Sequence, residues 1–103
     1  MAFRAEPEAS AELEDAAVWY ESRRLGLGLE FVQAVDAALE TIAHWPQIGR
    51  RVRGVPNDVA ARRFPIKRFP YHVVYLEWEG VIRILAFAHD SRKPGYWFSR
   101  INR

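Results

Sequence analysis

The chain has 103 residues, half of them hydrophobic, which suffices for one small folded domain and is too short for two. It contains no cysteine, which excludes disulfide bonds, a thiolate-ligated metal and a thiol nucleophile, and which fits a reducing cytoplasm. The net charge is only +2, but residues 1–49 carry nine acidic and three basic side chains, whereas residues 50–103 carry twelve basic and four acidic ones. The basic half predicts either a surface for a polyanion or an ordinary solvated face.

The chain shows no targeting or membrane signal. Its N-terminus lacks the apolar run of a signal peptide, and no window approaches the roughly 20 apolar residues of a membrane span. We therefore expect residues 1–103 to form a single domain of a cytoplasmic protein without a membrane partner.

The first half of the chain predicts a helical hairpin. Residues 2–6 are long enough only for a short edge strand, and Pro7 suits the first turn of a helix. Over residues 8–24, apolar side chains recur every three or four positions, at Ala9, Leu13, Ala16, Ala17 and Tyr20. After a segment with two glycines, a second apolar stripe follows, at Phe31, Val35, Ala38, Leu39 and Ile42. Pro46 ends it, so we expect two antiparallel helices.

The second half of the chain predicts β-structure. Residues 47–58 are rich in Gly, Pro, Asn and Arg and are typical of a loop. Strands are expected at 59–66, 71–78 and 81–89, the last two joined by the tight turn of a hairpin. Residues 90–103 could form a short final strand or an extended arm.

This order of elements predicts an α+β fold in which the helical hairpin packs on one face of a small antiparallel meander. If side chains alternate strictly between the two faces of the sheet, Val73 and Tyr75 share one face, and Val74 and Leu76 share the other. On the next strand, Arg83, Leu85 and Phe87 share a face. Both faces of the sheet are therefore apolar, and the helices can cover only one. We expect a partner protein to cover part of the other face; cover by the C-terminal arm or by a second copy of the chain is the alternative.

Several segments form one combined pattern. They are Ala11-Glu12-Leu13, Trp19-Tyr20-Glu21, Gly26-Leu27-Gly28 with Phe31, RFPYHVVY at 68–75, ILAFAH at 84–89 and RKPGYW at 92–97. Over nearly the whole chain, this pattern resembles the RelE/ParE superfamily of toxins from bacterial type II toxin–antitoxin systems. The resemblance implies an N-terminal strand, two helices and three further strands. It also implies a cognate antitoxin, usually encoded next to the toxin, whose C-terminal segment wraps the toxin in a hetero-oligomer.

The superfamily has two mechanisms. RelE-like toxins cleave messenger RNA in the ribosomal decoding site, whereas ParE-like toxins, associated with plasmid stabilisation, poison DNA gyrase and lack a cleavage site. The long helical hairpin and the RFPYHVVY segment look closer to the ParE side. The resemblance therefore implies a growth-inhibiting toxin with gyrase as its target; a RelE-like endoribonuclease and a non-toxic basic nucleic-acid-binding protein are the alternatives.

RNA cleavage by a neighbouring 2′-hydroxyl requires a base, an acid and cations that stabilise the phosphorane. If the protein is a nuclease, the candidate catalytic residues are His72, Arg92 and Tyr96, because adjacent strands and the loop that follows them could bring these side chains together. The RelE-like branch typically has arginine at the place of His72, and Tyr96 lies near the C-terminal tyrosine of that branch with shifted spacing. Histidine titrates near neutral pH, so it clamps phosphate less firmly than arginine does.

Target contacts are expected from basic side chains around the meander, namely Arg62, Arg63, Lys67, Arg68 and His89. Each candidate also has a structural interpretation. His72 could be a hydrogen-bonded sheet histidine, His89 could cap a turn, and Tyr96 could be a core or antitoxin-contact aromatic. The histidines are far apart in sequence and no paired carboxylates accompany them, so we expect neither a metal site nor a cofactor.

Overall fold

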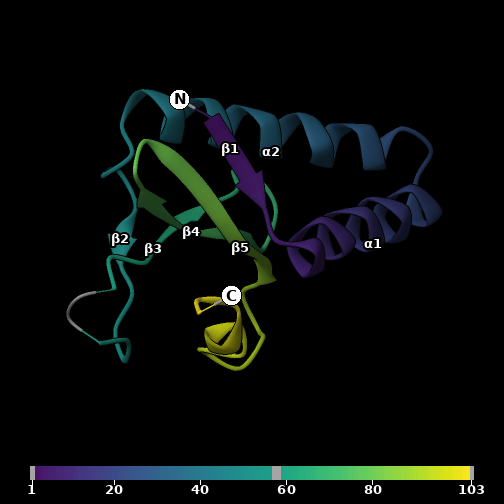
Figure 1. Cartoon of the computed structure of the whole chain (residues 1–103). Helices are drawn as coiled ribbons and strands as arrows, with labels where there is room; N and C mark the ends of the chain where they lie inside the picture. Colours follow the sequence, from purple (N-terminus) through teal and green to yellow (C-terminus); the bar gives the residue numbers. More distant parts are fainter. Residues whose placement is uncertain (1, 57–58, 103) are drawn as a thin grey trace.

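The structure, a computed structural model, describes residues 2–56 and 59–102. Its elements in chain order are β1 (Ala2–Ala5), α1 (Pro7–Arg23), α2 (Leu27–His44), β2 (Arg50–Arg51), β3 (Arg62–Pro65), β4 (Tyr71–Trp78), β5 (Val81–His89) and a short 3₁₀ helix, η1 (Phe98–Arg100). The helices lie on one side of the sheet and the C-terminal segment lies on the other (Figure 1). The predicted α+β architecture is confirmed. Neither helix in the described ranges is long and apolar enough to cross a membrane.

The turn of the helical hairpin depends on both glycines. Gly26 has φ +89°, a left-handed conformation that glycine adopts without strain. A Cβ at Gly28 would lie 2.6 Å from the carbonyl oxygen of Ala17, so glycine there lets the two helices approach closely. The Glu21 carboxylate accepts hydrogen bonds from the backbone N–H groups of Gly26 and Gly28, at 2.9 to 3.1 Å. A side chain of α1 thus satisfies donors at the start of α2.

The sheet has five strands in the order β1-β5-β4-β3-β2. Strand β1 pairs parallel with β5, and all the other neighbours are antiparallel, so the predicted meander is confirmed and extended by the N-terminal strand. Two boundaries differ from the prediction. The expected loop 47–58 contains the short strand β2, and the expected strand 59–66 is paired only over Arg62–Pro65. The residues just before β3 leave the ladder and pack their side chains under the sheet instead.

A β-bulge corrects the predicted facing of β5. Val74 pairs with Ala86 but Tyr75 pairs with Ile84, so Leu85 is an extra residue without a partner on β4. An extra residue reverses the alternation of the positions after it. Phe87 therefore packs with the helix-facing cluster and not on the same face as Leu85, as strict alternation had predicted.

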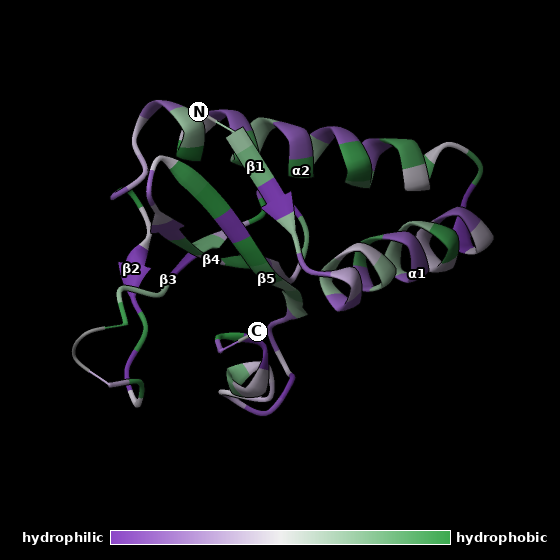
Figure 2. Cartoon of the chain, in the orientation of Figure 1, coloured by the Kyte–Doolittle hydropathy of each residue, from purple (hydrophilic) through white to green (hydrophobic). Residues whose placement is uncertain are grey.

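The face of the sheet under the helices holds a core of large side chains. Phe31 of α2 is fully buried, and its ring centroid lies 5.1 to 5.2 Å from those of Tyr20, Phe69 and Tyr71. Val73, Tyr75, Ile82 and Ile84 supply the strand side of this core. The hydropathy colouring shows β5 as mostly hydrophobic with one hydrophilic band, β2 as hydrophilic, and hydrophobic and hydrophilic residues in alternation along α2 (Figure 2). Burial of this apolar stripe explains the spacing seen in the sequence.

The opposite face is covered in part by the chain itself. Its buried residues are mostly small, and Trp97, which is only 3% exposed, packs against them. They are Ala61, Val74, Leu76, Leu85, Ala86 and Ala88. The C-terminal residues form neither the strand nor the extended arm that the sequence suggested; Gly95, with φ +81°, turns them into the compact η1 segment. Cover by the C-terminal segment, the alternative considered in the sequence analysis, therefore accounts for part of this face.

Candidate functional site

Five of the sequence-predicted residues surround one shallow hollow on the face opposite to the helices. They come from β3, β4, β5 and the following segment, and they are Arg63, His72, His89, Arg92 and Tyr96. The hollow has a volume of about 80 Å³. Ligand pockets usually span at least about 300 Å³. The arrangement is thus a cationic surface depression and not a cleft that could enclose a nucleotide.

The other three predicted residues lie elsewhere. The Arg62 guanidinium faces the helix side and donates hydrogen bonds to backbone carbonyls of the α2–β2 connection, the closer being that of Gly49 at 2.8 Å. Arg68, in the turn between β3 and β4, forms a 3.1 Å ion pair with Glu30 of α2. Lys67 is exposed beside it. Arg62 therefore holds the connection in place, and Lys67 and Arg68 form a separate basic site at the edge of α2.

His72 is a buried sheet histidine with one clear partner. Its Nδ1 atom lies 2.8 Å from Oδ1 of Asp90, which follows β5. Burial lowers the pKa of His72, and the hydrogen bond to Asp90 offsets that effect only in part. The imidazole is therefore neutral near pH 7, donates its Nδ1 proton to Asp90 and adds no permanent charge to the hollow.

A partly buried carboxylate that the sequence gave no reason to select organises this region. Glu12 of α1 accepts four hydrogen bonds: from the Tyr96 hydroxyl at 2.7 Å, from both terminal nitrogens of Arg100 at 3.0 and 3.2 Å, and from the backbone N–H of Phe87 at 3.2 Å. Burial and the hydrogen bond to Glu12 together raise the pKa of Tyr96 far above that of a free tyrosine. The Tyr96 hydroxyl therefore stays protonated and donates its hydrogen bond to Glu12.

The position of this network follows from the sheet. Strand β1 pairs with β5 only as far as Ile84, so the edge of β5 beyond that point lacks a neighbouring strand. There the Leu85 carbonyl accepts a hydrogen bond from Arg100 at 2.9 Å, and the backbone N–H of Phe87 donates to Glu12. Side chains thus replace the missing strand as partners of the backbone. The Arg92 guanidinium stacks 3.9 Å from the centroid of Tyr96, which fixes it at the surface.

These contacts limit the chemistry that the site can perform. Cleavage of RNA requires a base and an acid that can move protons. The Tyr96 hydroxyl donates its proton to Glu12, whereas the hydrogen bond between His72 and Asp90 engages only Nδ1 of the imidazole. Arg63, Arg92 and the nearby Lys93 keep exposed charges. The described ranges contain no group of three His, Asp or Glu residues arranged to hold a metal ion. The geometry is suited to binding an acidic surface.

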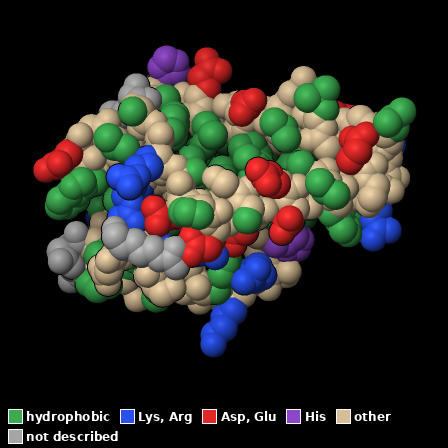
Figure 3. Space-filling model, turned by 45° about the vertical axis from the view of Figure 1, so that its right-hand side comes forward, with side chains coloured by type: hydrophobic (Ala, Val, Ile, Leu, Met, Phe, Trp, Pro, Cys, Tyr) green, Lys and Arg blue, Asp and Glu red, His purple; other side chains and the backbone are tan. Residues whose placement is uncertain are grey.

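A second exposed surface lies at the tip of the helical hairpin. Figure 1 shows the tip projecting beyond the sheet, and Figure 3 shows hydrophobic side chains exposed along the helices, with Lys and Arg side chains projecting from the lower part of the molecule. Four large apolar side chains at the tip are more than half exposed: Val18, Trp19, Leu25 and Leu29. The sequence already indicated this exposed surface, because these four apolar residues fall outside the apolar stripes of the two helices.

A helical hairpin on one face of a mixed five-stranded sheet, with a short C-terminal segment under the other, is consistent with the RelE/ParE fold. A chain of the chromosomal ParDE toxin–antitoxin system from P. aeruginosa has this fold: the TM-score is 0.69 at 20% sequence identity, over 86% of this chain and 95% of that chain. No curated protein matches the sequence. The family model of the ParE toxin of the type II toxin–antitoxin system, parDE, matches residues 3–94. The chain therefore belongs to the ParE toxin family, and its partner is a cognate antitoxin.

Proposed function

We propose that this toxin arrests growth by binding DNA gyrase, without covalent chemistry of its own. Membership of the ParE family supports this target. The observation that carries the non-enzymatic mechanism is the 2.7 Å hydrogen bond between the Tyr96 hydroxyl and the Glu12 carboxylate. Because the Tyr96 hydroxyl donates to Glu12, it is not free to act as an acid or a base in the hollow, as RNA cleavage would require. A toxin of this kind acts in the cytoplasm, where gyrase handles DNA, and binding by the antitoxin neutralises it.

The surface proposed to meet the target is the cationic depression, defined by Arg63, Arg92 and Lys93 with His89 at its border. Asp90 is the only carboxylate among the described residues that line it, and Asp90 is held by His72. The stacking of Arg92 on Tyr96 reduces the side-chain entropy that binding would otherwise cost. Gyrase presents bound DNA and acidic side chains, and both would be attracted to this surface. Lys67 and Arg68 form a second, weaker candidate contact.

Charge reversal tests this surface. The variant Arg63→Glu/Arg92→Glu should inhibit supercoiling by purified gyrase at least about tenfold less potently than the wild type, because two attractive contacts become repulsive. Arg23→Glu, which changes an exposed arginine at the end of α1, is the matched control and should stay within about twofold. Thermal unfolding of each variant checks the fold. Full potency of the double variant would show that the depression is not the contact.

The RelE-like alternative makes a different prediction for the same region. If the protein cut messenger RNA in the ribosome, Arg92→Ala would abolish cleavage mapped by primer extension on translated transcripts. Under the gyrase proposal, neither the wild type nor this variant produces such cuts.

A further inference from the structure

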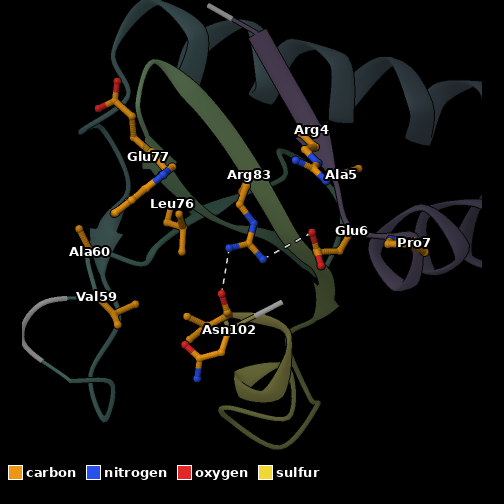
Figure 4. A pocket seen from close by; sticks show the side chains of 12 residues that line it. Arg4, Ala5, Glu6, Pro7, Val59, Ala60, Leu76, Glu77, Arg83 and Asn102 are labelled. Atoms are coloured by element: carbon orange, nitrogen blue, oxygen red, sulfur yellow. Dashed lines mark hydrogen bonds and ion pairs between the residues drawn. The ribbon is translucent and has the colours of Figure 1, made fainter.

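A large hollow lies on the sheet face opposite to the helices, beside the part that the C-terminal segment covers. It has a volume of about 870 Å³. Strands β1, β4 and β5 form its floor, and residues 59–60 and 101–102 form its far wall. Figure 4 shows Arg83 reaching into it from β5, between Glu6 and the C-terminal residues. This hollow is the part of the face that the chain itself leaves open.

Two arginines lie side by side on its floor. The parallel register of β1 and β5 pairs Arg4 with Arg83, and both line the hollow. Arg83 has a Glu6 carboxylate oxygen at 3.5 Å and donates to the carbonyls of Arg100 and Ile101 at 2.7 and 2.9 Å. No ion pair of Arg4 is found within residues 2–56 and 59–102. Like charges on neighbouring strands are unfavourable, so a carboxylate placed next to Arg4 would relieve the repulsion between the two arginines.

The rest of the lining is mixed: Glu77 and Asn102 are polar, and the other side chains are apolar. Val59, Leu76 and Ile101 contribute to its lining, and Trp78 at the end of β4 is 66% exposed. A phosphodiester chain would gain nothing from these side chains, and the Glu6 carboxylate would repel it. A peptide segment that carries one carboxylate and an adjacent apolar side chain matches both the charge and the surface.

We infer that this hollow receives a segment of the cognate antitoxin, with an Asp or Glu of that segment bound to Arg4 and a neighbouring apolar side chain packed against Leu76 and Trp78. The inference rests on the family, whose toxins pair with an antitoxin, and does not depend on gyrase as the target. The cationic depression around Arg92 lies beyond the covered part of the same face, next to Trp97. Antitoxin and target therefore have distinct contact residues on this face.

The test measures binding of the purified cognate antitoxin to variants of the full-length toxin. Arg4→Glu and Trp78→Ala should each weaken binding at least about tenfold. The controls are Arg23→Glu and Trp45→Ala; Trp45, like Trp78, is 66% exposed but does not line the hollow. Both controls should stay within about twofold of the wild type. Wild-type affinity of Arg4→Glu and Trp78→Ala would overturn the inference.

Hydrogen exchange of the wild-type complex gives a second readout that does not depend on a variant. The antitoxin should slow exchange of amides in β1 and at the β4–β5 turn. Unchanged exchange there in a saturated complex, or protection of these amides by gyrase but not by the antitoxin, would overturn the inference. The supercoiling assay is separate, so loss of gyrase inhibition in it would count against the target and not against this contact.

Discussion

The two faces of the sheet carry different kinds of side chain. Under the helices, large rings such as Phe31 and Tyr75 fill the space, and the core contains few polar groups. On the other face, alanines and a single buried tryptophan, Trp97, leave room for a cationic depression and an open hollow. The difference teaches that one face carries the stability of the fold, whereas the other carries the groups available for partners.

The two faces are also closed in different ways. The helices are attached through a continuous apolar stripe, which is non-directional and tolerant of small shifts. The C-terminal segment is attached through directed hydrogen bonds, chiefly those of Arg83 and of Arg100 with Glu12. Loss of one partner in such a network leaves other buried polar groups unsatisfied. The two faces should therefore respond differently to mutation.

The largest expected effect is on the helix face. Phe31→Ala should lower the free energy of unfolding by about 4 kcal/mol, because Phe31 is fully buried among three other rings that cannot all collapse into the space. Urea unfolding followed by circular dichroism measures it. Leu29→Ala, at a position 62% exposed on the same helix, should change the stability by less than about 1 kcal/mol. Equal losses for the two variants would contradict the assignment of the core.

A somewhat smaller loss is expected where the C-terminal segment is attached to α1. Glu12→Ala should cost about 3 kcal/mol, because it leaves the Arg100 guanidinium buried without its carboxylate. Unlike Phe31→Ala, it should also release the C-terminal segment, seen as faster hydrogen exchange in residues 96–101. Glu14→Ala changes an exposed carboxylate on the same helix and should have little effect. Unchanged exchange in Glu12→Ala would show that other contacts hold the segment.

The smallest effect is a pH dependence that originates at His72. Because the pKa of His72 is lower in the folded than in the unfolded state, the unfolded state binds the proton first as the pH falls. Stability should therefore decrease from about pH 6.5, the pKa of an unfolded histidine, down to the lowered pKa of the folded state. His72→Asn keeps an N–H donor near Asp90 but cannot titrate, so its unfolding free energy should be flatter over that range. An identical slope in both proteins would assign the effect to other groups.

Much of the architecture could be predicted from the sequence. The apolar spacing placed both helices, and Pro7 marked the residue at which the first one begins. The tight turn between two β-rich runs placed the β4–β5 hairpin. These elements follow from local patterns, because neighbouring residues on one face must share the same environment.

The remainder depends on contacts between distant residues. Glu12 meets Tyr96 and Arg100, which lie 84 and 88 positions further along the chain, and no local pattern selects one glutamate of α1 from the others. The bulge at Leu85 reverses the facing of Phe87 without a glycine or proline to indicate it. The hollow around Arg92 was predicted as a cluster, but the partners of His72 and Tyr96, which decide their chemistry, were visible only in three dimensions.

Whether this toxin acts by binding gyrase is tested most directly with the wild-type protein and purified gyrase on supercoiled DNA. The account predicts that the toxin blocks supercoiling and traps gyrase with cleaved DNA, and that the cognate antitoxin reverses both effects. Gyrase that works at full rate in excess toxin, together with toxin-dependent cuts in translated messenger RNA, would contradict it.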